Sequence, residues 1–193
     1  MLPKIDKKTL EVERTSTMDV WRAMEHCQKL GLCRAIGVSN CSTVMMLEIL
    51  SFCEIRPCSN QIECHPFLTL DSVHEFCDKM GIQIEAYAPL NPQENPMVNP
   101  QFKNMVLLED KVLLDLSKKY GKSPAQLVLN WHVHNHHVIF PRMTQEKHFA
   151  ENMEIFDWEM SEDDYKKISG MNKNARYYNV VPTEDFCFVP ISV

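Results

Sequence analysis

Polar, aromatic and basic side chains stand where four short apolar segments of the sequence end. The first segment ends in Ser39-Asn40, the second contains Asn60-Gln61, the third ends in Tyr87, and the fourth is followed by Arg142. Amide and hydroxyl groups can bind a carboxamide, an aromatic ring can stack on a planar heterocycle, and a guanidinium matches phosphate oxygens. Ser39-Asn40 could instead cap a helix and Tyr87 could fill the core. Their joint placement favours a binding site for a heterocycle with a carboxamide and a phosphate.

The spacing of apolar residues predicts alternating strands and helices. Strands are predicted over Arg34–Val38, Cys58–Glu63, Ile82–Tyr87 and His137–Phe140. Helices are predicted over Thr17–Leu30, Thr43–Phe52, Leu70–Met80, Leu107–Lys119, Pro124–Val133, Glu146–Glu154 and Ser161–Ser169. This alternation predicts a parallel α/β sheet, either doubly wound or part of a (β/α)8 barrel. In both architectures, ligands bind at the carboxyl ends of the strands.

Local signals indicate where several of these helices begin and end. Gly31 and Gly81 follow two apolar periodic segments, as glycines that terminate helices do. Ser123, Pro124 and Gln126 have the order of a capping box with proline in the first helical position.

Composition narrows the class of protein. The net charge of -6 over 193 residues argues against a general nucleic-acid partner. No apolar run reaches the roughly 18 residues that a membrane span needs, so no membrane partner is expected. The eight cysteines are scattered and form no Cys-x-x-Cys pair, which predicts reduced core thiols in a cytoplasmic protein.

Other ligand motifs receive little support from the sequence. Neither Gly-x-Gly-x-x-Gly nor a P-loop occurs, so a Rossmann pyrophosphate loop is not expected. His132 and His136 would share one face of a helix. They fall at a predicted helix C-terminus, where histidine is favoured, and no cysteine or carboxylate is near in sequence. No metal site is therefore predicted.

Seven segments resemble the aldo-keto reductases in that family's order and spacing. They are Trp21–Glu25, Gly31–Asn40, Asn60–Pro66, Ala86–Leu90, Leu107–Asp110, Lys122–Gln126 and Glu151-Asn152. The resemblance implies one domain over residues 1–193, part of a TIM barrel, in an oxidoreductase of aldehydes and ketones that uses NADP(H). The partner it implies is a small-molecule carbonyl substrate.

The resemblance also implies roles for residues at the nicotinamide end of the cofactor. Ser39, Asn40 and Gln61 would hold the carboxamide, and Tyr87 would stack on the ring. Leu90 and the loop after it would lie over the pyrophosphate. Ala88 and Asn91 stand where the family has serine and glycine, so the loop departs from the family's pattern.

At the adenosine end, the resemblance implies a clamp for the 2'-phosphate. Arg142 stands in place of the family's lysine, Thr144 would line the same pocket, and His148 replaces an arginine. Glu151 and Asn152 would contact the adenine. Glu94 would bridge to the arginine and fold the loop over the cofactor.

The segments of the resemblance match only the second half of the family's barrel. The family's catalytic aspartate, tyrosine, lysine and histidine belong to its first four strands, so no catalytic residue is predicted here. Two interpretations follow: a C-terminal, N-terminally truncated portion of an enzyme that carries most of the cofactor site, or an inactive nucleotide-binding or protein-interaction member. A four-stranded sheet with open edges and the apolar faces of Ile36, Ile62 and Ile84 also predicts self-association.

Overall fold

A computed structural model describes residues 15–91, 100–102, 104–143 and 145–178. The strands are β1 (Val38–Ser39), β2 (Ser59–Glu63), β3 (Gln83–Tyr87) and β4 (Val138–Phe140). The helices are α1 (Thr17–Lys29), α2 (Thr43–Phe52), α3 (Asp71–Met80), α4 (Lys111–Tyr120), α5 (Pro124–His134), α6 (Glu146–Met153) and α7 (Glu162–Ser169). Two 3-10 turns, η1 (Pro100–Phe102) and η2 (Leu107–Glu109), precede α4.

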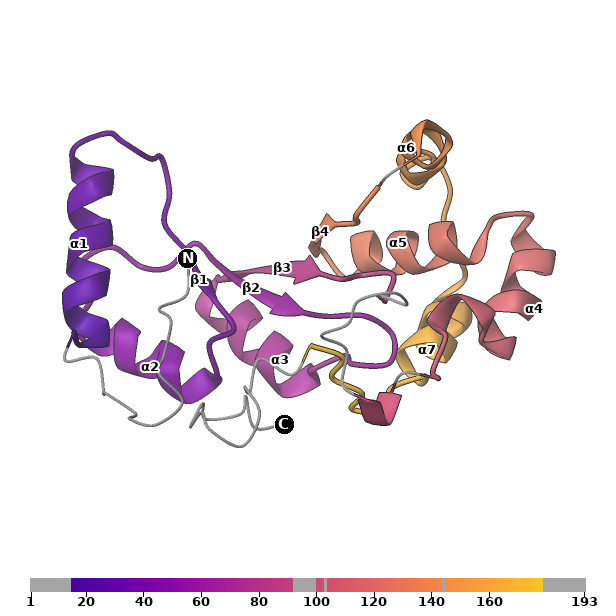
Figure 1. The fold of residues 1–193 in the computed structure, drawn as a ribbon, viewed down its shortest axis with the longest axis horizontal. Coiled ribbons are helices and arrows are strands. Elements are labelled where there is room, and N and C mark those ends of the chain that lie inside the picture. The colour runs from indigo at the N-terminus through magenta and orange to yellow at the C-terminus, as the bar shows by residue number, and fades with distance from the viewer. Residues whose placement is uncertain (1–14, 92–99, 103, 144, 179–193) are drawn as a thin grey trace.

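The four strands form one parallel sheet in the order β1-β2-β3-β4 (Figure 1). Strands that follow one another in sequence are therefore neighbours in the sheet, and their order does not reverse. A doubly wound sheet needs such a reversal, so the described strands have the arrangement of part of a (β/α)8 barrel. In Figure 1, α1 and α2 lie at the β1 end, and α4, α5 and α7 gather at the other.

Most predicted helix ends are confirmed because their signals are local. Ser123 and Gln126 form the predicted capping box at the start of α5, with Pro124 in the first turn. Gly31 and Gly81 adopt left-handed backbone angles, φ 73° and 66°, just after α1 and α3. Only glycine enters this region without a steric cost, which is why these helices end there.

Two elements differ from the prediction. The strand expected over Arg34–Val38 is reduced to Val38–Ser39. Next to it, Gly37 runs too close to β2 for a side chain. A Cβ at Gly37 would lie 3.0 Å from the carbonyl oxygen of Ser59. The helix expected from Leu107 is interrupted, because the Asp110 side chain accepts from Val112 N and begins a new helix, α4.

The apolar core lies on the helix-covered face of the sheet. Ile36, Ile62 and Ile84 are all buried there, so the expectation that they line an open face is wrong. The exposed apolar side chains of the sheet are instead on β4, where Val138 and Phe140 are 44% and 49% exposed. No helix in the described ranges has both the length and the apolar character needed to cross a bilayer.

Candidate functional site

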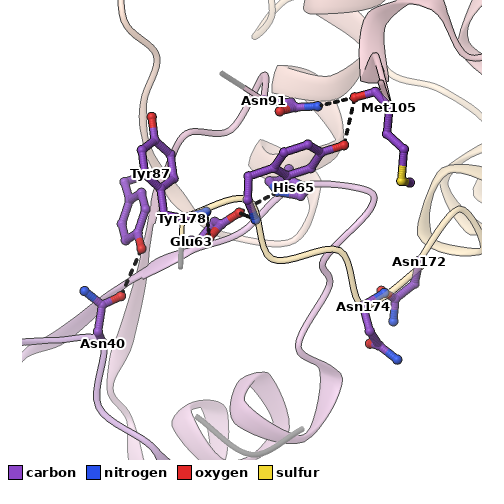
Figure 2. A network of polar contacts seen from close by, with 10 residues as sticks. Asn40, Glu63, His65, Tyr87, Asn91, Met105, Asn172, Asn174 and Tyr178 are labelled. Carbon is purple, nitrogen blue, oxygen red and sulfur yellow. Dashed lines mark hydrogen bonds and ion pairs between the residues drawn. The ribbon is translucent and has the colours of Figure 1, made fainter. Parts of the chain in front are cut away.

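Strand register brings the predicted carboxamide-binding residues together. Ser39 is aligned with Gln61, and the Ser39 hydroxyl donates to the Gln61 carbonyl at 3.0 Å. Asn40 follows in a left-handed conformation, φ 54°, and its amide donates to the Ser39 hydroxyl at 3.3 Å. The Tyr87 hydroxyl donates to the Asn40 amide oxygen at 3.1 Å (Figure 2). Ser39, Asn40, Gln61 and Tyr87 therefore form one group at the ends of three strands.

The Tyr87 side chain is suited to ring stacking and not to proton donation. Burial, with a smaller contribution from the Glu63 charge, raises the pKa of Tyr87 to about 12. The hydroxyl therefore stays protonated at neutral pH and remains bound to Asn40. The Tyr178 ring meets the Tyr87 ring edge to face, with centroids 5.7 Å apart (Figure 2). This geometry suits the stacking of a planar group on Tyr87 and does not suit proton transfer by it.

Glu85 is a member of this group that the sequence analysis missed. It lies next to Gln61 in the register, and its carboxylate accepts from the Gln61 side-chain amide at 3.0 Å. The contact orients the amide that is expected to meet a carboxamide. The signal that could have found it is the alternation of strand residues, which places Gln83, Glu85 and Tyr87 on the same face.

Glu63 ties the segment after α7 to the same end of the sheet. Its two carboxylate oxygens accept from the backbone amides of Tyr177, at 2.6 Å, and Tyr178, at 3.0 Å. His65 Nε2 lies 3.1 Å from the same carboxylate (Figure 2). Both side chains, Glu63 and His65, are fully buried. Glu63 thereby holds Tyr178 beside Tyr87, a juxtaposition that no local sequence pattern indicates.

The predicted adenosine-phosphate residues line a separate pocket of about 310 Å³. The pocket lies between the loop after β3, the start of α5, and α6. Its residues are Leu90, Leu108, Ser123, Pro124, Ala125, Arg142, His148, Glu151 and Asn152. One wall is thus apolar, as a planar base requires, and the rest carries cations and polar groups, as a phosphate and an adenine edge require.

Buried Gln126 holds two walls of this pocket together. Its side-chain amide donates to the Glu151 carbonyl at 3.0 Å, while its oxygen accepts from Ser123 N at 3.0 Å. The same residue therefore caps α5 and fixes α6 against it. Arg142 and His148 are both exposed at the pocket rim. Thr144 and Glu94, which were predicted to contribute here, lie outside the described residues.

The loop after β3 links the two parts of the candidate site. Ala88 and Asn91 both have left-handed backbones, with φ 52° and 64°. Asparagine is among the few residues other than glycine that enter this region readily, so Asn91 keeps a turn that a glycine would make. Its side chain also donates to the Met105 carbonyl at 3.0 Å (Figure 2). Leu90 is thus held between the Tyr87 group and the pocket that it lines.

A parallel βα sheet whose strand order does not reverse, with ligand-type residues toward its strand ends, is the arrangement of an α/β barrel protein. Residues 6–173 match the sequence model of the aldo/keto reductase family, so the chain belongs to that family. It is 34% identical over 188 residues to aldo-keto reductase family 1 member A1 of Homo sapiens, which covers 97% of this chain and 57% of the relative. The Danio rerio member A1-A is 32% identical over 183 residues, covering 95% and 55%. The chain therefore spans little more than half the length of these relatives.

Proposed function

We propose that this chain binds NADP(H) and provides the cofactor-binding portion of a carbonyl oxidoreductase. The observation that carries the proposal is the pocket that collects Leu90, Arg142, His148, Glu151 and Asn152 from the β3 loop, the β4 loop and α6. By the family resemblance, Leu90 lies over the pyrophosphate, and the other four residues belong to the 2'-phosphate and adenine end of the cofactor. Family membership supports the reaction class, and the relatives named above are aldo-keto reductases.

In this proposal, each part of the site has a task. The Tyr87 ring would carry the nicotinamide, and Asn40 and Gln61 would meet its carboxamide. Arg142 and His148, both at the pocket rim, would meet the 2'-phosphate. When bound, the dinucleotide supplies or accepts the hydride. The chain's own residues would bind it and orient its two ends.

Proton transfer to a carbonyl oxygen is not assigned to any residue of this chain. Tyr87 keeps its proton, since burial raises its pKa to about 12, and its hydroxyl is bonded to Asn40. By resemblance, the family's proton-donating residues fall on strands outside this match. We therefore expect the chain by itself to bind NADPH and to reduce no aldehyde. This outcome also fits the alternative of an inactive nucleotide-binding member, and turnover by a longer protein that includes the strands of those proton-donating residues separates the two.

Binding measurements with Arg142→Gln test the proposal. A charge-assisted hydrogen bond to phosphate contributes about 1.5–3 kcal/mol, so the NADPH dissociation constant should rise by roughly 10–100-fold. NADH, which lacks the 2'-phosphate, should be affected little. Lys147→Gln is the matched control, because Lys147 is an exposed cation of α6 that does not line the pocket. Calorimetry that finds no NADPH binding to the wild-type chain, or equal losses in both variants, contradicts the proposal.

A further inference from the structure

Four side chains from two distant parts of the sequence form a continuous chain of contacts. His132 Nδ1 lies 2.9 Å from His137 Nδ1, and His137 Nε2 lies 3.0 Å from His74 Nδ1. His74 Nε2 then lies 3.6 Å from the sulfur of Cys64. The residues come from α3, α5 and the segments next to β2 and β4, so only the fold brings them together. None of them lines the pocket assigned to the cofactor.

Three side chains of this cluster hold their potential metal-ligand atoms close together. The Cys64 sulfur and one ring nitrogen each of His132 and His137 all lie within 4.8 Å of one another. A tetrahedral zinc ion separates two nitrogen ligands by about 3.4 Å, and a nitrogen from a sulfur by about 3.6 Å, given its usual bond lengths. Side-chain shifts of about an ångström therefore suffice to bring the three atoms to these separations. All three residues are buried.

A neutral imidazole ring keeps one unprotonated nitrogen, so the three histidine rings of the cluster can offer electron pairs to a cation. Buried His132 contacts His137 through Nδ1, and the Pro89 backbone also lies beside the His132 ring.

A second pocket opens on two of these residues, His74 and His137. His74 and His137 line a pocket of about 320 Å³, together with Trp131, Asn135 and Ser169. Asp71, Glu75 and Asp78 stand on the same pocket, and all three are exposed. Carboxylates around an opening raise the local concentration of cations.

We propose that Cys64, His132 and His137 bind a divalent transition-metal ion of the zinc class. Sulfur and imidazole ligands favour such an ion over magnesium or calcium, which prefer oxygen. Binding replaces the thiol proton of Cys64 by the metal, and one proton leaves to solvent for each ion bound. His74 acts as a positioning residue, because it contacts both His137 and the Cys64 sulfur. The site is independent of the proposed cofactor binding.

Titration with Co²⁺ as a spectroscopic substitute for zinc tests the site in the intact chain. We expect one Co²⁺ per chain, with visible absorption of a four-coordinate ion and a thiolate-to-cobalt charge-transfer band. Zn²⁺ should displace the cobalt. At 100 times its dissociation constant, Zn²⁺ should also raise the melting temperature by roughly 5–10 °C.

Matched variants identify the ligands. Cys64→Ala should abolish the charge-transfer band, and His132→Gln should weaken binding by at least ~100-fold, more than the ~10–100-fold expected for His74→Gln. Cys77→Ala, at another buried cysteine, should bind as the wild type does. His136→Asn is the matched histidine control, because His136 is exposed and has a φ of 58°, which asparagine tolerates.

A wild-type spectrum without a thiolate band overturns the proposal, and so does an unchanged Co²⁺ affinity in Cys64→Ala. It is also overturned if Cys77→Ala and His136→Asn lose as much Co²⁺ affinity as the ligand variants do. The wild-type spectrum and Cys77→Ala decide the matter even if a ligand variant fails to fold. NADPH binding is read separately by calorimetry, so failure of the metal site leaves the cofactor proposal intact, and the reverse also holds.

Discussion

At the scale of single residues, the candidate nicotinamide end depends on how the Gln61 amide is held. One of its N–H groups donates to Glu85, which leaves the oxygen and the second N–H to meet a ligand. Glu85 therefore acts through Gln61 and has no assigned contact with the cofactor. Asn40 is held in the same way, since its oxygen accepts from Tyr87 and its amide donates to Ser39.

Removal of the Glu85 side chain should weaken only the nicotinamide half of binding. We expect Glu85→Ala to raise the NADPH dissociation constant by about 2–10-fold, the loss typical of one hydrogen bond. Binding of 2',5'-ADP should not change, because that fragment lacks the nicotinamide. Glu85→Gln keeps an acceptor and should stay near wild type. Equal weakening of both ligands in Glu85→Ala would show that the variant disturbs the whole fold instead.

Residues at strand ends could be predicted from sequence because a parallel sheet places those ends together. Ser39, Gln61 and Tyr87 followed from that rule, and the structure gathers them. Glu85 could also have been predicted, from the alternation of strand residues. The contacts of His74 with His137 and of Glu63 with Tyr178 could not be predicted, because residues so far apart in sequence meet only after the helices have packed.

At the scale of elements, the segment after α7 is fixed to the sheet by one carboxylate. Both oxygens of Glu63 accept from backbone amides of that segment. Tyr177 adds a second attachment, since its hydroxyl donates to the Met105 carbonyl at 2.8 Å. The position of Tyr178 beside Tyr87 therefore depends on an anchor buried in β2.

Glu63→Gln should release this segment while leaving the sheet intact. Glutamine replaces one acceptor oxygen by a donor, so one of the two backbone amides loses its partner. We expect the amide-exchange protection of Tyr177 and Tyr178 to fall by roughly 10-fold or more, as for a lost hydrogen bond to a charged group. The amides of β3 should keep theirs. Unchanged protection at both tyrosines would contradict the anchoring role.

Helices α4 and α7 are joined by the buried carboxylate of Asp164. It accepts from Lys119 at 2.5 Å and Tyr120 at 2.6 Å on α4, and from Lys167 at 2.6 Å on its own helix. The Ser161 hydroxyl, at 2.9 Å, completes its partners. Lys119, Lys167 and Tyr120 together hold the pKa of Asp164 well below its usual value.

This depressed pKa predicts how stability depends on pH. Because the folded pKa lies below the unfolded value of about 3.9, the contribution of Asp164 is present above about pH 4 and is lost as the pH falls further. Asp164→Asn should lower the free energy of unfolding at pH 7 by about 1–2 kcal/mol, a modest loss because both ammonium groups are more than half exposed. The difference between the two proteins should narrow below pH 4 in urea melts. A difference that stays constant down to pH 2 would refute the assignment.

Most helix ends and three of the four strands were predicted to within a residue or two, whereas the extent of β1 and the start of α4 were not. A cap such as Ser123 with Gln126 is decided by neighbours in sequence. The close approach of Gly37 to Ser59, in contrast, involves another strand and has no local sequence signal. Asp110 shows the limit of the first kind of signal, because its capping role was hidden inside a continuous apolar pattern.

At the scale of the whole molecule, the proposed cofactor pocket and the proposed metal site lie at opposite ends of α5. Its first turn lines the pocket assigned to the cofactor, and His132 near its last turn belongs to the proposed metal site. A single helix thus connects them, and Asn130 between them is bonded to the carbonyls of Ile155 and Trp158. A change at either end that tilts α5 would affect both, which is why each proposal has its own binding readout.

Self-association remains a prediction, and β4 is the strand through which we expect it to occur. Within the described residues β4 pairs only with β3, and it exposes Val138 and Phe140. An outer strand with unpaired backbone groups and exposed apolar side chains favours pairing with another chain. Sedimentation velocity across a concentration series should therefore show dimers or larger species in the wild type.

Phe140→Lys should raise the dissociation constant of the dimer by at least about 10-fold, because a charge on an outer strand opposes pairing. Phe156→Lys is the control, since Phe156 is 65% exposed but lies in a loop after α6. A wild type that is monomeric at every concentration, or equal effects of the two lysines, would exclude β4 as the contact.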